Sequence, residues 1–307
     1  MYNAFFGFDL DPFRVNPDPR FLYFSESHRE ALATLVYAVQ ERKGFIVLTG
    51  EVGTGKTTVL NAMLQKVGSE VQTAYLFNTK LSVQDFFSYL FDELEIERME
   101  PYTKSEALHR LNHHLIDRLR KGHQTLLIID EAQNLSNELL EEIRMLSNLE
   151  TPQSKLLQIV LVGQPELDAK LSKPELRQLR QRVELRHSIR ALGPQETAAY
   201  VRERLLIAGH DTGEVFTPAA LKAVHARSSG IPRIINVLCD NALLIAFGQQ
   251  ALRIAAAMVD EAARDLGLDS PIVTSASQPA RPARPVQRTG LLRRIWSRGR
   301  AAAELGL

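Results

Sequence analysis

Five short apolar runs in this chain alternate with longer stretches whose apolar positions recur every three or four residues. The apolar runs predict strands at Phe45–Thr49, Thr73–Asn78, Leu126–Asp130, Leu156–Val162 and Glu184–Ile189. The longer stretches predict helices at Ser25–Arg42, Thr57–Val67, Val83–Leu94, Ser105–Lys121 and Asn137–Leu149. Strands that alternate with helices form parallel sheets covered on both faces, so residues 43–190 are predicted to be an α/β domain.

The pattern changes after Ala191, where helical stretches follow one another with no predicted strand between them. They predict helices at Pro194–Ala208, Pro218–Ser228, Arg233–Phe247 and Ala255–Leu266, so residues 191–267 are predicted to be a small helical domain. Residues 1–42, an aromatic segment and the first helix, are expected to pack on the α/β core. Most of its aromatic side chains are interpreted as core residues rather than as a stacking surface for adenine: Phe5, Phe6, Phe8, Phe13, Phe21 and Tyr23.

The sequence GEVGTGKT, residues 50–57, joins a predicted strand to a predicted helix. It fills every fixed position of the phosphate-binding pattern G-x-x-x-x-G-K-[ST], in the setting that the pattern requires. Its glycines allow a tight turn whose N–H groups point inward, at the positive end of the helix dipole. Lys56 is expected to reach the β- and γ-phosphates of a nucleoside triphosphate, and the Thr57 hydroxyl to bind Mg²⁺. The predicted nucleotide-binding residues are Gly50, Glu51, Val52, Gly53, Thr54, Gly55, Lys56, Thr57 and Thr58.

Two adjacent carboxylates, Asp130 and Glu131, stand at the end of the predicted strand Leu126–Asp130. Asp130 is expected to bind Mg²⁺, directly or through water. Because side chains alternate at a strand end, Glu131 points elsewhere and is placed to polarise an attacking water molecule. A solvated strand end would be the ordinary interpretation of such a pair, but the phosphate-binding loop upstream favours the catalytic one.

The net charge of +1 conceals an uneven distribution. Residues 270–307 hold seven arginines and one acid, Glu304, which gives +6 and leaves −5 for the rest of the chain. Within the predicted tail, residues 268–307, Ser270–Thr289 is too poor in apolar residues to order itself, and Leu291–Arg300 is briefly amphipathic. Three interpretations of the tail remain open: a disordered segment without function, a helix for a membrane surface or a partner, and attachment to nucleic acid.

The remaining composition indicates a globular protein of a reducing compartment. The single cysteine, Cys239, cannot form an internal disulfide, and Met1–Asp11 lacks a basic and apolar signal. The sequence holds no apolar run near the roughly 18 residues that a membrane span needs, so we expect a cytoplasmic protein, at most peripheral to the inner membrane. The histidines at 109, 113 and 114 lack the intervening glutamate of a zinc-protease helix and are interpreted as a surface helix face.

Several motifs, the phosphate-binding loop among them, occur together in this chain, and the aromatic start and the VGQPEL segment are far more restrictive than the loop. The motifs are residues 2–7 (YNAFFG), 12–13, 16–21 (NPDPRF), 44–58, 130–133 (DEAQ), 158–167 (QIVLVGQPEL), 192–204 and 230–233 (GIPR). With the α/β-then-helical organisation, this set resembles the AAA+ ATPases. More narrowly it resembles the secretion-pathway protein A-like ATPases and their relatives in pilus assembly and polysaccharide export. The resemblance covers roughly residues 1–267, and it implies a P-loop NTPase sheet sandwiched by helices with a helical lid domain.

The resemblance also implies roles for single residues. Gln164, after the fourth core strand, would sense the γ-phosphate and position water, although a simple turn residue before Pro165 is the alternative. Arg233, at a helix start, would reach back to the phosphates, since an arginine there is unfavourable to the helix dipole unless an anion lies nearby. In a cluster of arginines, Arg182 is the first choice and Arg177 the second for contact with the ATP of a neighbouring subunit. Arg180 and Arg186 complete that cluster, which a solvated basic helix face would also explain.

Taken together, the resemblance implies a Mg²⁺-dependent ATPase that forms a homo-oligomer. It would drive or regulate assembly of an envelope secretion, pilus or polysaccharide-export system, through a partner protein in the envelope complex or inner membrane and with membrane contact through residues 291–300. The alternative is a DNA-binding AAA+ ATPase of the transposition-helper type, which the charge of −5 outside the tail disfavours. A third hypothesis is a nucleotide-gated scaffold with negligible turnover.

Overall fold

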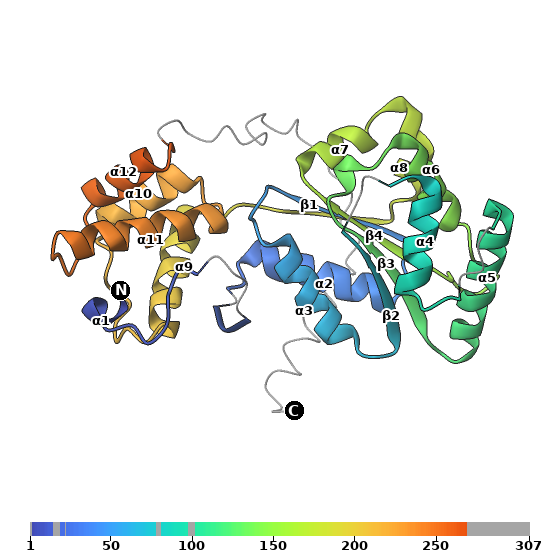
Figure 1. Ribbon diagram of the computed structural model, residues 1–307, viewed down its shortest axis with the longest axis horizontal. Coiled ribbons are helices and arrows are strands. Elements are labelled where there is room, and N and C mark those ends of the chain that lie inside the picture. The colour runs from blue at the N-terminus through green and yellow to red at the C-terminus, as the bar shows by residue number, and fades with distance from the viewer. Residues whose placement is uncertain (1, 15–18, 22, 78–80, 98–101, 269–307) are drawn as a thin grey trace, which may run out of the picture. The chain divides into compact units, whose positions relative to one another are not determined.

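The computed structural model describes residues 2–14, 19–21, 23–77, 81–97 and 102–268. Five parallel strands form one sheet in the order β2-β3-β4-β1-β5 (Figure 1). The strands are β1 (Phe45–Gly50), β2 (Val71–Leu76), β3 (Gln124–Ile129), β4 (Gln158–Gly163) and β5 (Leu185–Ile189). Each predicted strand is confirmed, with ends shifted by two residues at most. Since the sheet is parallel, the carboxyl ends of all five strands meet at one edge.

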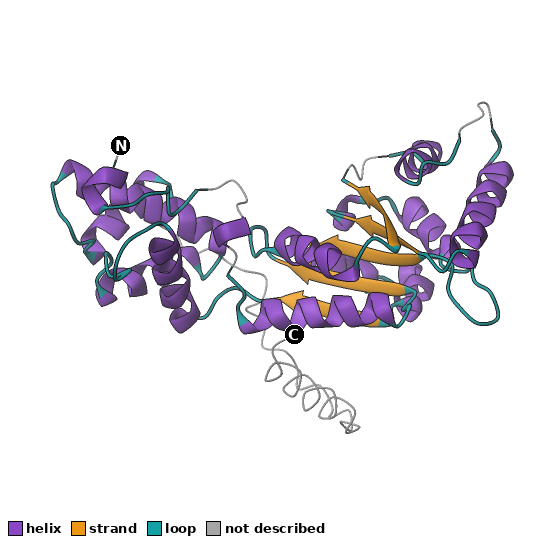
Figure 2. Ribbon diagram, turned by 90° about the horizontal axis from the view of Figure 1, so that it is seen from below, coloured by secondary structure: helices purple, strands orange, loops and turns teal. Residues whose placement is uncertain are grey.

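Helices cover both faces of the sheet (Figure 2). Successive side chains of a strand point to opposite faces of the sheet, and both faces of β3 are apolar. Leu126 and Ile128 pack in the core that contains α2 and α3, whereas Leu127 and Ile129 pack in the core on the other face. The helices of the sheet domain are α2 (Glu26–Gln40), α3 (Lys56–Val67), α4 (Val83–Glu93), α5 (Lys104–Arg120), α6 (Asn137–Leu146), α7 (Pro165–Leu171) and α8 (Arg177–Arg182). The two shortest, α7 and α8, were not predicted, because six or seven residues are too few to display a helical period.

A second core belongs to the helices that follow the sheet. They are α9 (Pro194–Ile207), α10 (Pro218–Ser228), α11 (Pro232–Gly248) and α12 (Ala256–Asp265), and all four were predicted. Pro stands at the start of α9, α10 and α11, where its missing N–H costs nothing.

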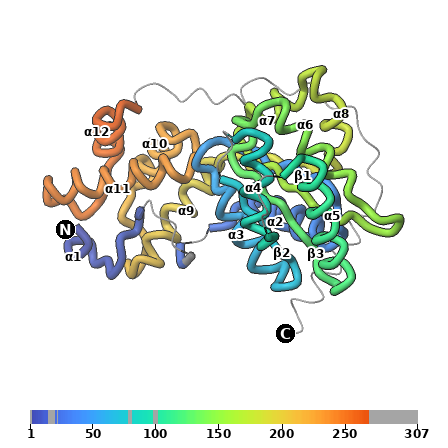
Figure 3. Tube along the Cα trace, turned by 45° about the vertical axis from the view of Figure 1, so that its right-hand side comes forward, coloured from blue at the N-terminus to red at the C-terminus, as the bar shows by residue number. Residues whose placement is uncertain are grey.

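The N-terminal aromatic segment packs in this second core, beside α9 and α11 (Figure 3). The prediction that it packs on the α/β core is therefore wrong, and only α2 lies on the sheet. Arg204 of α9 explains part of the attachment, since its guanidinium donates to the Pro12 carbonyl oxygen at 2.6 Å and stacks on the Phe21 ring. The short helix α1 (Asn3–Phe6) buries Phe6 in the same core, so the aromatic residues are core residues, as predicted.

Within the described part of the chain, no helix combines the length and apolar character needed to cross a membrane. The amphipathic segment predicted at residues 291–300 lies outside the described residues.

Candidate functional site: a phosphate-binding loop and its carboxylates

The phosphate-binding loop connects β1 to α3 at the carboxyl edge of the sheet. Gly53 and Gly55 have φ of +79° and +96°, which side chains with a Cβ rarely adopt. The Lys56 ammonium donates to the carbonyl oxygens of Gly50 and Glu51, at 2.8 and 3.1 Å, and so spans the loop. Burial lowers the pKa of Lys56, while Glu131 and Asp130 nearby act in the opposite direction.

The loop fits a polyphosphate. Lys56 is only 7% exposed, and within the described residues no carboxylate forms a salt bridge with it, so a buried positive charge stands at the base of the loop. The first N–H groups of α3 have no partner inside the helix and carry its positive dipole. Thr57 is exposed at the start of α3, where its hydroxyl is accessible to a cation held beside the phosphates. Thr58 follows it and is half-buried.

The helical domain contacts the loop through the start of α11. The Arg233 N–H donates to the Gly53 carbonyl oxygen at 3.3 Å, and a Cβ added to Gly53 would lie 2.6 Å from the Arg233 Cβ. Any side chain at position 53 would therefore push α11 away. The structure thus brings Arg233, predicted from the GIPR motif, into contact with the phosphate-binding loop.

Asp130 follows β3 and is held in place from two sides. The Tyr75 hydroxyl of β2 donates to Asp130 Oδ2 at 3.1 Å, and the Glu131 N–H donates to Oδ1 at 2.8 Å. Burial and the neighbouring Asp130 carboxylate together raise the pKa of Tyr75, so this hydroxyl keeps its proton and remains a donor. Carboxylate oxygens are ligands that Mg²⁺ prefers, and Asp130 and Thr57 are the residues that would hold the ion. Sequence reasoning did not identify Tyr75, because nothing in the β2 sequence marks it.

Glu131 is held by two amide side chains. The Gln133 Nε2 donates to Glu131 Oε2 at 2.6 Å, and the Gln164 Nε2 donates to the same oxygen at 3.0 Å. The Gln164 backbone N–H donates in turn to Gln133 Oε1 at 3.1 Å, which closes a ring of hydrogen bonds among the three residues. Burial alone would raise the pKa of Glu131, but the two amides and the Lys56 ammonium outweigh it, so the pKa lies below its ordinary value. No described residue donates to Oε1, so this oxygen can accept a proton from water.

Gln133 is the member of this ring that sequence reasoning missed. It stands in the DEAQ motif, which supported the family resemblance but suggested no role for its last residue. Gly163, at the end of β4, makes room for it, since a Cβ there would lie 2.7 Å from Gln133 Oε1. Lys170 of α7 donates to the Gln133 carbonyl oxygen at 3.0 Å and fixes the backbone behind the amide.

The arginine cluster divides into two parts. Arg186 of β5 forms an ion pair with Asp168 of α7 at 2.9 Å, and Asp168 also accepts a hydrogen bond from the Thr49 hydroxyl at 2.8 Å. Arg186 is therefore engaged within its own chain. The other three arginines, 177, 180 and 182, are exposed on α8.

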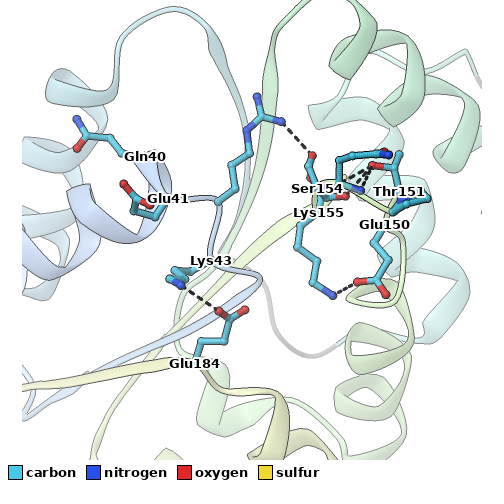
Figure 4. A pocket seen from close by; sticks show the side chains of 11 residues that line it. Gln40, Glu41, Lys43, Glu150, Thr151, Ser154, Lys155 and Glu184 are labelled. Atoms are coloured by element: carbon cyan, nitrogen blue, oxygen red, sulfur yellow. Dashed lines mark hydrogen bonds and ion pairs between the residues drawn. The ribbon is translucent and has the colours of Figure 1, made fainter. Parts of the chain in front are cut away.

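Arg182 lies at the amino edge of the sheet, opposite the loop. With Phe45, the first residue of β1, and Glu184, it lines a cavity of 170 Å³. An adjoining cavity of 560 Å³ lies between the end of α2 and the segment before β4, lined by charged side chains that include Lys43, Glu150, Lys155 and Glu184 (Figure 4). Five residue steps of β1 separate this edge from Gly50, roughly 16 Å, so the structure does not bring Arg182 to the phosphate-binding loop of the same chain.

Comparison with known proteins agrees with this geometry. Residues 39–171 match an AAA domain. The fold resembles CDC6P from Pyrobaculum aerophilum (TM-score 0.63, 17% identity, 81% of this chain and 71% of that one). It also resembles the Aeropyrum pernix ORC2 protein (TM-score 0.60, 18% identity, 84% of this chain and 72% of that one). A third similar structure is that of a mutant of Thermotoga maritima RuvB (TM-score 0.53, 18% identity, 82% of this chain and 74% of that one). The chain belongs to the AAA+ ATPases, and the predicted fold class is confirmed.

One relative is much closer in sequence than these structures. The chain is 45% identical over 258 residues to General secretion pathway protein A of Aeromonas hydrophila. The match covers 83% of this chain and 46% of that protein, so the chain spans about half the length of this relative. The narrower resemblance drawn from the sequence motifs is confirmed.

Proposed function

We propose that this protein binds ATP with Mg²⁺ and hydrolyses it. The observation that carries the proposal is the grouping at one sheet edge of the loop with Lys56, the Asp130 carboxylate, and Glu131 held by the Gln164 amide. Partial burial of a carboxylate, and its fixation by two amides beside a buried lysine, cost free energy, which a strand end without such a function would avoid by leaving the carboxylate in water. The nucleotide would occupy Gly50–Thr58 and meet Arg233 from the helical domain.

The chemistry follows from what each side chain can do. Glu131 Oε1 accepts the proton of the water that attacks the γ-phosphorus, since Oε2 is engaged by the two amides. Gln164 donates one amide hydrogen to Glu131 and retains a second for the γ-phosphate or that water. Lys56 leaves its loop carbonyls to contact phosphate oxygens, and its charge stabilises the transition state. Mg²⁺ would neutralise charge on the β- and γ-phosphates.

We further propose that the active site is completed by a second copy of the chain. Arg182 is exposed and faces away from its own loop, at the opposite edge of the sheet, where a neighbouring subunit's phosphate-binding loop can meet it. An arginine supplied in this way stabilises charge that develops on the γ-phosphoryl group. Arg177 and Arg180 lie on the same helix and are the alternatives.

The cellular role that we propose is assembly of an envelope secretion, pilus or polysaccharide-export system. Similarity to General secretion pathway protein A supports it. In this role the ATPase acts at the cytoplasmic face of the inner membrane through a partner protein of the envelope complex.

The test is the Mg²⁺-dependent ATPase rate across a protein dilution series. We expect the specific rate to rise with protein concentration, because a monomer lacks the arginine of its neighbour. Parallel samples contain anionic liposomes or duplex DNA, and stimulation by liposomes favours the envelope role. Stimulation by DNA that disappears with salt would favour the transposition-helper alternative. A flat, negligible rate in every sample would contradict hydrolysis and favour the scaffold.

A further inference from the structure

His28 lies behind the phosphate-binding loop. It stands in the first turn of α2 and is 3% exposed. Its Nε2 lies 2.7 Å from the Thr54 carbonyl oxygen of the loop, and its Nδ1 lies 2.6 Å from the Ser25 hydroxyl, the N-cap of α2. Both ring nitrogens are therefore engaged, one by the loop and one by the helix cap.

The partners determine where the proton sits. A carbonyl oxygen only accepts, so Nε2 carries the hydrogen and donates to Thr54. In the neutral ring Nδ1 is then an acceptor, and the Ser25 hydroxyl donates to it. Burial lowers the pKa of His28. Of the charged groups around it, Glu196 raises this pKa and Arg29 lowers it. The neutral ring thus satisfies both of its hydrogen-bonding groups without a charge in the interior.

The ring also occupies the space beside Gly55. A Cβ added to Gly55 would lie 2.8 Å from His28 Nε2, closer than real Cβ contacts, and φ at this glycine is +96°. Loop and imidazole therefore fit together only because residue 55 has no side chain. This contact is an additional reason for glycine here, beyond the positive φ.

We propose that His28 is a positioning residue of the phosphate site, which fixes the Thr54–Gly55 peptide so that the Gly55 N–H faces the bound phosphates. The physical reason is the planarity of the trans peptide, in which C=O and N–H point in opposite directions. A Thr54 oxygen held on the imidazole turns the next N–H toward the other side of the loop. Because Gly55 is the N-cap of α3, this N–H is a donor at the positive end of the helix. The inference rests on the proposed function, since it assigns a role within the nucleotide site.

The experiment compares two substitutions with opposite consequences. His28→Met keeps much of the side-chain volume and removes the donor, whereas His28→Gln keeps an N–H donor. Calorimetric titrations use ADP, inorganic pyrophosphate and adenosine as probes. We expect His28→Met to raise Kd for ADP and pyrophosphate about tenfold, as the loss of one hydrogen bond near a charged ligand implies, and to leave adenosine within about twofold. His28→Gln should recover most of the affinity.

A matched control is His109→Met, which removes an exposed imidazole from α5 and should change none of the three constants. The inference is overturned if His28→Met binds ADP as the wild type does, or if it loses adenosine and ADP equally. A second measurement needs no variant: nitrogen-15 NMR of the nucleotide-free wild type should find the hydrogen on Nε2 of His28, and finding it on Nδ1 would also overturn the inference. Wild-type protein that binds neither ADP nor pyrophosphate would contradict the proposed function as well, which separates the two failures.

Discussion

The two edges of the sheet use charged residues in different ways. At the carboxyl edge the charged side chains are partly or fully buried, and each has fixed hydrogen-bond partners: Lys56 on two carbonyls, Asp130 on a hydroxyl and an N–H, Glu131 on two amides. At the amino edge Lys43 and Glu184 form a longer contact of 3.8 Å between side chains that are 34% and 40% exposed. Buried charges need fixed partners, because desolvation is costly, whereas exposed charges are screened by water.

This difference indicates that substitutions at the carboxyl edge should affect the chemical reaction, whereas substitutions at the amino edge should affect contact with other molecules. A fixed network reacts to the loss of one hydrogen bond, because its geometry is part of the reaction. An exposed charged surface tolerates single changes in the isolated subunit, and its residues become important when another molecule covers them. Substitutions at the two edges should therefore differ both in the size of their effects and in the quantity that changes.

Glu131→Gln should have the largest effect. The glutamine keeps the shape of the side chain but cannot accept the proton of the attacking water, so we expect kcat to fall about a thousandfold. The Kd for ATP should change by less than about threefold, because the loop and Lys56 are intact. Steady-state rates and calorimetric titration measure the two quantities. A variant that kept a tenth of the wild-type rate would exclude Glu131 as the base.

Arg182→Ala should lower kcat roughly a hundredfold at saturating protein, since one donor that stabilises transition-state charge is lost. A subunit with an intact arginine should complete the site of an Arg182→Ala subunit. Mixing Arg182→Ala with Glu131→Gln should therefore restore part of the rate, because mixed oligomers contain complete sites. Failure of the mixture to exceed either variant would contradict completion by a neighbour, and Arg177→Ala and Arg180→Ala would be tested next in the same way.

Gln133→Met should lower kcat about tenfold and leave the Kd for ATP unchanged. The thioether fills the space of the amide but donates no hydrogen bond, so Glu131 loses its 2.6 Å partner and its defined orientation. Gln65→Met is the matched control, since Gln65 is exposed at the far end of α3. Equal rates for Gln133→Met and wild type would show that Gln164 alone orients the carboxylate.

Much of this site was predictable from sequence, and the exceptions have a common physical cause. The loop, Asp130 and Glu131 are adjacent in sequence to elements with clear periodicity, so their place at the carboxyl edge follows from the parallel sheet. Gln133, Tyr75 and His28 act through contacts across 31, 55 and 26 residues of sequence. Hydrophobic periodicity does not predict a hydrogen bond between residues so far apart in sequence, since their side chains come together only after the sheet has formed.

The N-terminal segment illustrates the same limit on a larger scale. Its aromatic residues pack in or against a hydrophobic core, as predicted, but that core is the one of the helical domain. The apolar composition of a segment predicts that it is buried, but it does not predict which helices or strands it packs against, because the hydrophobic effect is not directional. The directional contact is the hydrogen bond from Arg204 to the Pro12 carbonyl oxygen, which joins positions 192 residues apart.

The histidine behind the loop should make stability depend on pH. Burial lowers the pKa of folded His28 below its ordinary value of 6.5, so the unfolded chain binds the proton first as the pH falls. The free energy of unfolding should therefore decrease as the pH drops below about 6.5, and His28→Gln should show a shallower decrease. Urea denaturation at a series of pH values measures it. Identical slopes for the two proteins would mean that His28 has the same pKa in the folded and unfolded states and would contradict the prediction.

The smallest effect is expected at the amino edge. Lys43→Met removes the contact with Glu184 and should change the free energy of unfolding by less than about 1 kcal/mol, the usual value of an exposed ion pair. Glu184→Ala should cost more than Lys43→Met, because Glu184 Oε1 also accepts the Gly44 N–H at 2.7 Å, and Glu184→Gln should preserve that bond. Denaturant titration of the three variants ranks them. If Lys43→Met were the most destabilising, the amino edge would be a fixed network like the carboxyl edge, and the contrast between the two would fail.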